Sequence, residues 1–270
     1  MTPGIYALLG PNGAGKSTLI HILTDNLKAD SGTVTYTDRF GKTENTRAMG
    51  ERFREKLGFM PQQPAVYNNF SAERFLWYVA SLKGMSRTEA ARRIPEVLSA
   101  VELSDVARHR IGTFSGGMKQ RLSLAQAVLG DPSVLILDEP TAGLDPKQRI
   151  VIRNYISRIA LNKIVIIATH IVSDIEYIAR DVIMLKKGVI LDHGTPSALA
   201  SKIHGTVWSL HAKEAEIASL SEKFRIVSMV KNEASGGITL RILSKIKPCE
   251  NAVLLEPSLE DYYLSVFGEN

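Results

Sequence analysis

A glycine-rich run near the start of the sequence constrains the fold more than any other feature. It follows an apolar run, Ile5 to Leu9, and precedes Leu19, Ile20 and Leu23 at helical spacing. A loop of this composition between a strand and a helix points backbone N–H groups inward at a positive helix end, where they bind phosphate. The predicted loop comprises Gly10, Pro11, Asn12, Gly13, Ala14, Gly15, Lys16, Ser17 and Thr18.

Two residues of this loop have distinct chemical tasks. The Lys16 ammonium would reach the β and γ phosphates of a nucleotide, and the Ser17 hydroxyl would bind Mg²⁺. The helix that follows is expected to extend from Ser17 to Leu27. A chance glycine-rich turn would need neither the preceding strand nor this helix, so nucleotide binding is the favoured interpretation.

A later apolar run ends in two acidic residues. Val134 to Leu137 is uninterrupted and of strand length, as is Ile164 to Ala168, which is typical of parallel strands covered on both faces. Asp138 follows the first run and would hold Mg²⁺ beside the phosphate loop. Glu139 suits a general base that orients and deprotonates an attacking water, which a simple nucleotide switch would not need.

Strand-like and helical patterns alternate over most of the sequence, which predicts a parallel α/β core. Residues 66–132 are mostly helical in pattern, and Pro95 is expected to kink or split one helix. The final part shows short strand-like runs around one charged helix, with a turn at 233–237. We therefore expect an α/β domain at 1–200, with residues 66–132 as a helical subdomain, and a small α+β domain at 201–270.

The composition excludes several classes of protein. Hydrophobic residues make up 44% of the 270 residues and charged residues 23%, which rules out intrinsic disorder. The longest apolar runs fall far short of the ~18 to 20 residues of a membrane span. The net charge of +5 comes from basic residues interspersed with acids, so no nucleic acid is expected as a partner. A single cysteine, Cys249, and no secretory signal favour the reducing cytoplasm.

A second glycine-rich loop narrows the class further. Ser115, Gly116 and Gly117 stand just before a helical pattern and again present bare backbone N–H groups at a positive helix end. One nucleotide does not need two such anion sites within one chain. The economical interpretation is that this loop contacts the γ-phosphate held by a second copy or by a homologous partner.

In these motifs the sequence resembles the nucleotide-binding subunits of ATP-binding cassette (ABC) transporters, over Gly4 to about Ala200. The resemblance implies a P-loop NTPase fold with a helical insertion. It makes residues 10–18 the Walker A loop and residues 115–121 the signature. Asp138 and Glu139 become the Walker B aspartate and the catalytic glutamate.

The resemblance assigns three further residues. Gln62, which follows Pro61, would sense Mg²⁺ and the attacking water. Asp145, which ends the segment Ala142-Gly143-Leu144-Asp145, would belong to a loop that crosses the dimer interface, and His170 would be the switch histidine at the γ-phosphate. Without the other motifs, Gln62 and His170 would be interpreted as ordinary surface or core residues. Both are assigned a function because they occur in the family's order among those motifs.

The sequence departs from the family's pattern at three places. Phe114 stands where leucine is usual and Met118 where glutamine is commonest, but both only flank the signature glycines. Family members also carry two antiparallel strands before the Walker A strand, with an aromatic side chain that stacks on adenine. These strands are expected to be missing, because the sequence starts at the edge of the Walker A strand. Tyr6 is on that strand itself and is predicted to pack in the core, so it does not replace the stacking residue. The residues expected to bind the phosphates are unaffected, but the sequence offers no residue that would stack on adenine.

The resemblance implies an ATP-hydrolysing subunit that uses ATP and Mg²⁺. Its partners would be a second nucleotide-binding subunit, identical or homologous, and a separate transmembrane permease that holds it at the inner face of the cell membrane. Tyr67, Phe70, Phe75 and Trp77 are either permease contacts or core residues. Residues 255–264 are similar to the C-terminal end of exporter-type subunits, which makes export the expected direction of transport. Alternatively, this segment is an amphipathic terminal helix that only packs against its own domain.

Two alternatives within the family do not transport. A chromosome or DNA-repair ATPase would need a long coiled-coil insertion between Walker A and the signature, and residues 62–115 leave no room for one. A translation-associated protein usually carries two cassettes, and one Walker A loop is present.

Overall fold

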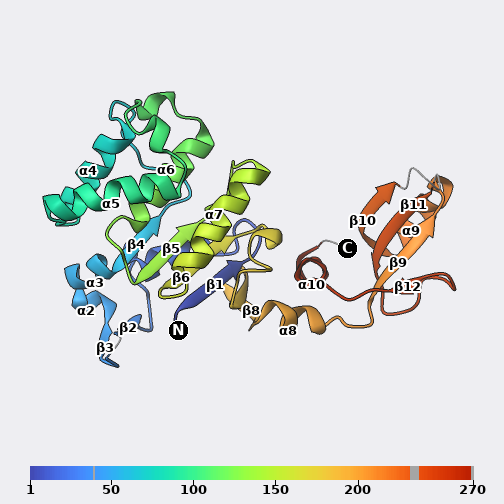
Figure 1. Cartoon of the computed structure of the whole chain (residues 1–270). Helices are drawn as coiled ribbons and strands as arrows, with labels where there is room; N and C mark the ends of the chain where they lie inside the picture. Colours follow the sequence, from blue (N-terminus) through green and yellow to red (C-terminus); the bar gives the residue numbers. More distant parts are fainter. Residues whose placement is uncertain (39, 232–236, 269–270) are drawn as a thin grey trace. The chain divides into compact units, whose positions relative to one another are not determined.

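The computed structural model describes residues 1–38, 40–231 and 237–268. The chain divides into two compact units, Met1–Asp192 and His193–Asn270 (Figure 1). Each unit has its own sheet and its own buried apolar cluster. The residues predicted to carry chemistry all lie in the first unit.

A six-stranded sheet forms the centre of the first unit, in the order β4-β5-β6-β1-β7-β8. Neighbouring strands from β4 to β7 run parallel, as predicted. The turn Lys187-Gly188 joins β7 to β8, and both of its residues have positive φ (51° and 79°), which suits a tight hairpin. The strands are β1 Gly4–Leu9, β4 Leu57–Met60, β5 Val134–Asp138, β6 Ile164–Thr169, β7 Asp181–Lys186 and β8 Val189–Gly194.

Helices cover this sheet because its strands are apolar on both sides. Side chains of one face, among them Tyr6 and Ile136, form a buried cluster with Ile20 of α1 and Phe53 of α3. Tyr6 is therefore a core residue, as predicted. The helices near the sheet are α1 Lys16–Leu23, α2 Thr46–Met49, α3 Glu51–Lys56 and α7 Pro146–Ile159, and a small hairpin is formed by β2 Thr35–Thr37 and β3 Thr43–Asn45.

Helix α1 is shorter than the sequence predicts. It ends at Leu23, and the expected continuation to Leu27 is wrong. Asp25 adopts a left-handed conformation with φ 60°, and the backbone N–H groups of Asn26 and Leu27 both donate to the His21 carbonyl. These hydrogen bonds close the last turn, and the left-handed Asp25 ends the helix.

A group of helices between β4 and β5 forms the predicted insertion and gathers beyond one end of the sheet (Figure 1). Serines begin three of them, because the hydroxyls of Ser71, Ser86 and Ser115 each accept a backbone N–H of the first turn. The expected split at Pro95 does not occur, since α5 continues through it as one helix. The elements are α4 Ala72–Leu82, α5 Arg87–Ala100, α6 Gly116–Val128 and the short 3-10 helices Ser104–Val106 and Ile111–Thr113.

The second unit contains a four-stranded sheet in the order β10-β11-β9-β12. One face packs Leu210, Leu240 and Ile242 against apolar side chains that include Leu220 of α9. Arg241 donates to both oxygens of Asp261 on α10, at 2.8 and 2.6 Å. Of the turn predicted at 233–237, residues 233–236 lie outside the described residues. The elements are α8 Pro196–Ser201, β9 Val207–Ala212, the 3-10 helix Glu214–Glu216, α9 Ile217–Lys223, β10 Arg225–Lys231, β11 Ile238–Leu243, β12 Val253–Leu254 and α10 Leu259–Phe267. A further 3-10 helix, Val172–Asp174, belongs to the first unit.

Across the part of the chain that the structure describes, no helix combines the length and the apolar character needed to cross a membrane.

The packing of α6 on β4 depends on a glycine. A Cβ at Gly58 would lie 2.3 Å from the Ala127 carbonyl oxygen and 2.8 Å from Leu135 Cδ1, and neither group can withdraw from the core. We expect Gly58→Ala to lower the free energy of unfolding by ~1 to 3 kcal/mol, the usual cost of overpacking. Urea denaturation of the two proteins measures this difference.

The matched control is Gly130→Ala. A Cβ there would approach the flexible side chain of Lys83, with the nearest atom, Cδ, at 3.2 Å. This variant should unfold at nearly the wild-type urea concentration. Equal stability of the Gly58→Ala variant and the wild type would show that the contact of α6 with β4 is less tight than described.

Candidate functional site

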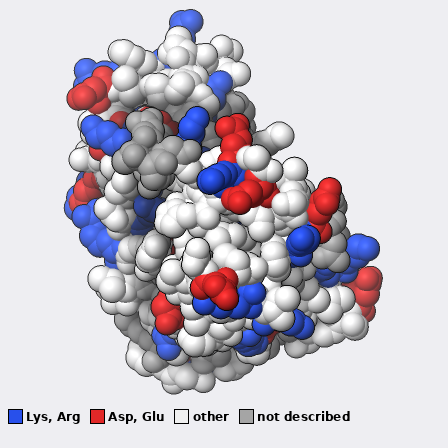
Figure 2. All heavy atoms as spheres, turned by 90° about the vertical axis from the view of Figure 1, so that its right-hand side faces the viewer, with Lys and Arg blue, Asp and Glu red and all other residues white. Residues whose placement is uncertain are grey.

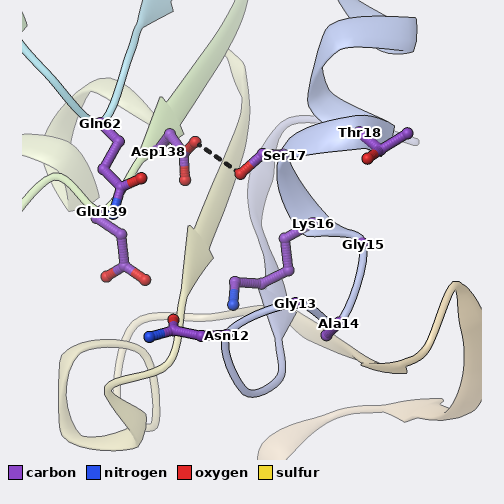
Figure 3. Close-up of a pocket in the computed structure, with 10 residues that line it drawn as sticks. All are labelled: Asn12, Gly13, Ala14, Gly15, Lys16, Ser17, Thr18, Gln62, Asp138 and Glu139. Atoms are coloured by element: carbon purple, nitrogen blue, oxygen red, sulfur yellow. Dashed lines mark hydrogen bonds between the residues drawn. The ribbon is translucent and has the colours of Figure 1, made fainter.

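A polar cavity of about 350 Å³ opens where β1 and β5 end (Figure 3). Its lining joins segments that are far apart in the sequence. The lining residues are Asn12, Gly13, Ala14, Gly15, Lys16, Ser17, Thr18, Gln62, Asp138 and Glu139. The structure thus brings together the phosphate loop, the acidic pair and the glutamine that the sequence analysis singled out.

The phosphate loop holds its shape through backbone conformations and contacts that glycine permits. Gly13 and Gly15 have φ of 77° and 102°, which residues with a side chain rarely adopt. The hairpin turn between β7 and β8 backs the loop, because the Gly188 N–H donates to the Ala14 carbonyl at 2.8 Å. Gly10 is equally constrained, since a Cβ there would lie 2.3 Å from the Leu185 carbonyl oxygen.

Lys16 lies inside the curve of this loop. Its Nζ donates to the carbonyl oxygens of Gly10 and Pro11, at 2.6 and 3.1 Å, and the residue is buried. Burial lowers the pKa of the Lys16 ammonium, while the nearby carboxylates of Glu139 and Asp138 oppose that shift. A buried ammonium facing a polar cavity favours an anionic ligand.

Asp138 and Ser17 face one another across the cavity (Figure 3). The Ser17 hydroxyl donates to Asp138 Oδ2 at 3.4 Å. Burial raises the pKa of the Asp138 carboxyl, and the neighbouring Glu139 carboxylate raises it further. A hydroxyl, a carboxylate and the Gln62 amide therefore line one cavity, and these oxygen donors are of the kind that Mg²⁺ prefers.

Glu139 is held at both of its carboxylate oxygens. The Thr169 hydroxyl donates to Oε2 at 3.0 Å, and the His170 backbone N–H donates to Oε1 at 3.1 Å. The His170 ring also contacts Oε1, with Nδ1 at 2.7 Å. The Glu139 side chain is buried, with 4% of the residue exposed. Thr169, the last residue of the neighbouring strand β6, and His170 after it hold the carboxylate at the edge of the cavity.

The signature residues lie outside this cavity. Ser115 caps α6 by accepting the Met118 N–H at 3.2 Å, and Gly116 and Gly117 form the first turn of that helix. A Cβ at Gly117 would lie 3.1 Å from Gln148 Oε1, which places the signature beside the start of α7. Asp145 caps α7 by accepting the Gln148 N–H at 2.8 Å. Within one chain, the signature and Asp145 are therefore neighbours and do not reach the phosphate loop.

Sequence reasoning missed several hydrogen bonds at Glu139 and next to it. Gln120 donates from Nε2 to the Glu139 carbonyl at 2.8 Å. Thr169 binds the carboxylate, and the buried Thr141 hydroxyl donates to Asp174 on the segment that follows His170. Thr169 directly precedes the predicted His170, and this position could have indicated its role. Gln120 lies within the predicted signature, residues 115–121, but nothing in the sequence indicates its contact with Glu139.

A phosphate-binding loop, an aspartate at the end of a parallel strand and a buried glutamate beside it define a nucleotide-hydrolysing protein of the P-loop class. The family model described as ABC transporter matches residues 3–142. The chain belongs to the ABC transporter family, as the sequence predicts, and it binds and hydrolyses ATP.

Relatives match along most of this chain. An uncharacterised ABC transporter ATP-binding protein of Bacillus subtilis (strain 168) is 36% identical over 234 residues, which are 86% of this chain and 75% of that protein. The Nod factor export ATP-binding protein I of Rhizobium sp. (strain N33) is 32% identical and covers 97% of this chain and 88% of its own length. The linearmycin resistance ATP-binding protein of Bacillus subtilis is 34% identical, over 74% of this chain and 63% of that protein.

Solved structures share the fold. The ATP-binding subunit of an ABC transporter aligns with a TM-score of 0.66 at 27% identity, over 74% of this chain and 82% of its own. A bacterial ABC transporter cassette solved as a dimer has a TM-score of 0.65 at 26% identity, over 72% of this chain and 86% of its own. Both likenesses agree with the predicted P-loop NTPase architecture.

Proposed function

We propose that this chain is the ATP-hydrolysing subunit of an ABC exporter and that it energises a separate membrane permease. The main support is that a single chain assembles the phosphate loop, Asp138, Glu139 and Gln62 around one cavity. The signature serine, Ser115, does not line this cavity and stands at the start of α6. The signature is then free to complete the site of a second nucleotide-binding subunit, identical or homologous.

In the proposed reaction, each residue of the cavity has one task. The backbone N–H groups of the phosphate loop and the Lys16 ammonium bind the β and γ phosphates. Glu139 accepts a proton from the water that attacks the γ-phosphate, and its contact with His170 orients the carboxylate for this transfer. Gln62 lies on the same cavity and orients the water.

Magnesium fits the donors that the cavity offers. Ser17, Asp138 and Gln62 would hold it, and it would neutralise charge on the phosphate oxygens. Among the described residues, no cluster of three or more His, Cys, Asp or Glu side chains could hold a metal ion without help. Phosphate oxygens of ATP would therefore supply the remaining ligands, so Mg²⁺ and ATP bind together.

The names of the relatives support export, because one is a Nod factor export protein and another a linearmycin resistance protein. A permease would hold the subunit at the cytoplasmic face of the cell membrane. Tyr67 and Phe70, whose rings are 5.2 Å apart, are candidate contacts, and Tyr67 is 52% exposed. Phe75 is 2% exposed, so it is a core residue and not a contact.

A non-transport ABC ATPase remains the second candidate, acting in DNA repair, on chromosomes or in translation. Such a protein would need a basic surface for nucleic acid. On the face shown in Figure 2, basic and acidic side chains are interspersed without a block of one sign. This face therefore presents no basic block of the kind that nucleic acid requires.

The role of Glu139 is tested by Glu139→Gln. Glutamine keeps the shape but cannot accept the proton, so we expect ATP binding to persist while turnover falls by ~10²-fold or more. Phosphate release at saturating ATP measures turnover, and the exposed Glu55→Gln is the control for the same chemical change. Unchanged phosphate release in the Glu139→Gln variant would remove Glu139 from the mechanism.

A shared site is tested by mixing two inactive variants, Lys16→Ala and Ser115→Arg. A mixed homodimer retains one site with an intact phosphate loop and an intact signature, so partial ATPase activity should return on mixing. Each variant mixed with itself is the control. Well-folded mixed dimers without any activity would contradict a site built from one intact loop and one intact signature.

The transporter role is tested by capture from membranes. An affinity-tagged chain expressed from its own genome should co-purify with one multi-span membrane protein, identified by mass spectrometry. Recovery of ribosomes or chromosomal DNA in place of such a protein would favour the second candidate.

A further inference from the structure

We propose that Gln120 is a positioning residue that fixes Glu139 through its backbone and so links the signature helix to the hydrolytic carboxylate of the same chain. The inference rests on the proposed function, in which Glu139 accepts the proton of the attacking water. It concerns a contact inside one chain, between α6 and the end of β5.

The contact is a buried hydrogen bond between distant segments. Gln120 is 4% exposed and lies in the second turn of α6, the helix that Ser115 begins. Its Nε2 donates to the Glu139 carbonyl at 2.8 Å, with both groups buried. A buried amide that bonds a backbone carbonyl costs free energy when its partner is lost, so the bond resists separation.

Glu139 needs such a support because its backbone is in an unusual conformation. Its φ is 50°, in the left-handed region that costs a residue with a side chain ~1 to 2 kcal/mol. The Glu139 N–H donates to the Ala168 carbonyl at 2.9 Å, and the Ala142 N–H donates to the Glu139 carbonyl at 3.1 Å. Gln120 adds a side-chain donor from another element to the same carbonyl.

The backbone and the carboxylate of Glu139 are therefore held from different directions. Thr169 at the end of β6 and His170 directly after it bind the carboxylate, whereas Gln120 on α6 binds the carbonyl. If the α6 donor is lost, the peptide can rotate and the carboxylate shifts relative to the water it must deprotonate. A shift of about 1 Å can lower a rate by ~10²-fold, while the phosphate loop is untouched.

This bond also connects two nucleotides in a dimer. The signature at the start of α6 is proposed to contact ATP held by the partner, and Gln120 follows Ser115 on the same helix. A displacement of α6 caused by the partner's nucleotide would move the Gln120 amide. Each chain would thereby adjust its own Glu139 to the occupancy of the other site.

The test replaces Gln120 by methionine, which is similar in length but has no donor. We expect kcat for Gln120→Met to fall at least ~10-fold, while the affinity for ATP stays within about twofold of wild type. The control is Ser123→Ala on the same helix, because the buried Ser123 hydroxyl has no hydrogen-bond partner in the described part of the chain. Ser123→Ala should keep the wild-type kcat.

A second measurement separates positioning from general damage. Because Gln120 is proposed to act through Glu139, Gln120→Met should cause no further loss of residual turnover in the Glu139→Gln background. If Gln120→Met reduces the amount of folded protein, Gln120→Asn serves instead, since its amide is too short to reach Glu139. Circular dichroism melting reports the fold of each variant.

The outcomes distinguish the two proposals. Wild-type turnover in Glu139→Gln would overturn the assignment of Glu139 itself. Loss of turnover in Glu139→Gln but wild-type kcat in Gln120→Met and Gln120→Asn would overturn the positioning role alone. A parallel loss of kcat and of ATP affinity, or a further loss in the Glu139→Gln background, would show that Gln120 is a structural residue.

Discussion

The parallel hydrogen-bond ladder that joins β5, β6 and β1 determines the arrangement of everything else in the first unit. Leu9 pairs with Thr169 and Asp138 with Ala168, so three strands end at the same level. Parallel strands present their carboxyl ends at one edge of the sheet, where ligands of α/β proteins bind. The phosphate loop and His170 directly follow two of these strands, and the acidic pair stands at the end of the third, so all of them meet at that edge.

The electrostatics of the cavity follow from this crowding at the sheet edge. Burial lowers the pKa of the Lys16 ammonium and raises that of the Asp138 carboxyl, so both charged forms are disfavoured without a ligand. A triphosphate gives Lys16 an opposite charge, and a divalent cation gives Asp138 one. Opposite charges on the nucleotide and the metal would thus compensate the desolvation that folding imposes on Lys16 and Asp138.

Much of this arrangement could be predicted from the sequence, because strand-ending motifs such as Gly10–Thr18 and Asp138-Glu139 carry their chemistry in their spacing. Local patterns failed where tertiary contacts decide the outcome. Helix α1 ends early through a left-handed Asp25, and α5 is not split at Pro95. The contact of Gln120 with Glu139 could not be predicted, since the acceptor is a backbone carbonyl that every residue possesses.

The order of strands in the sheet has a kinetic consequence. Strand β1, which leads into the phosphate loop, precedes every other strand of its sheet in sequence, yet it lies between β6 and β7. Its pairing must wait until Ile164–Thr169 and Asp181–Lys186 have left the ribosome, and such non-local pairing is slow. The loop that binds the phosphates is therefore synthesised early but acquires its native neighbours late, so nucleotide binding requires that the sheet of the first unit be complete.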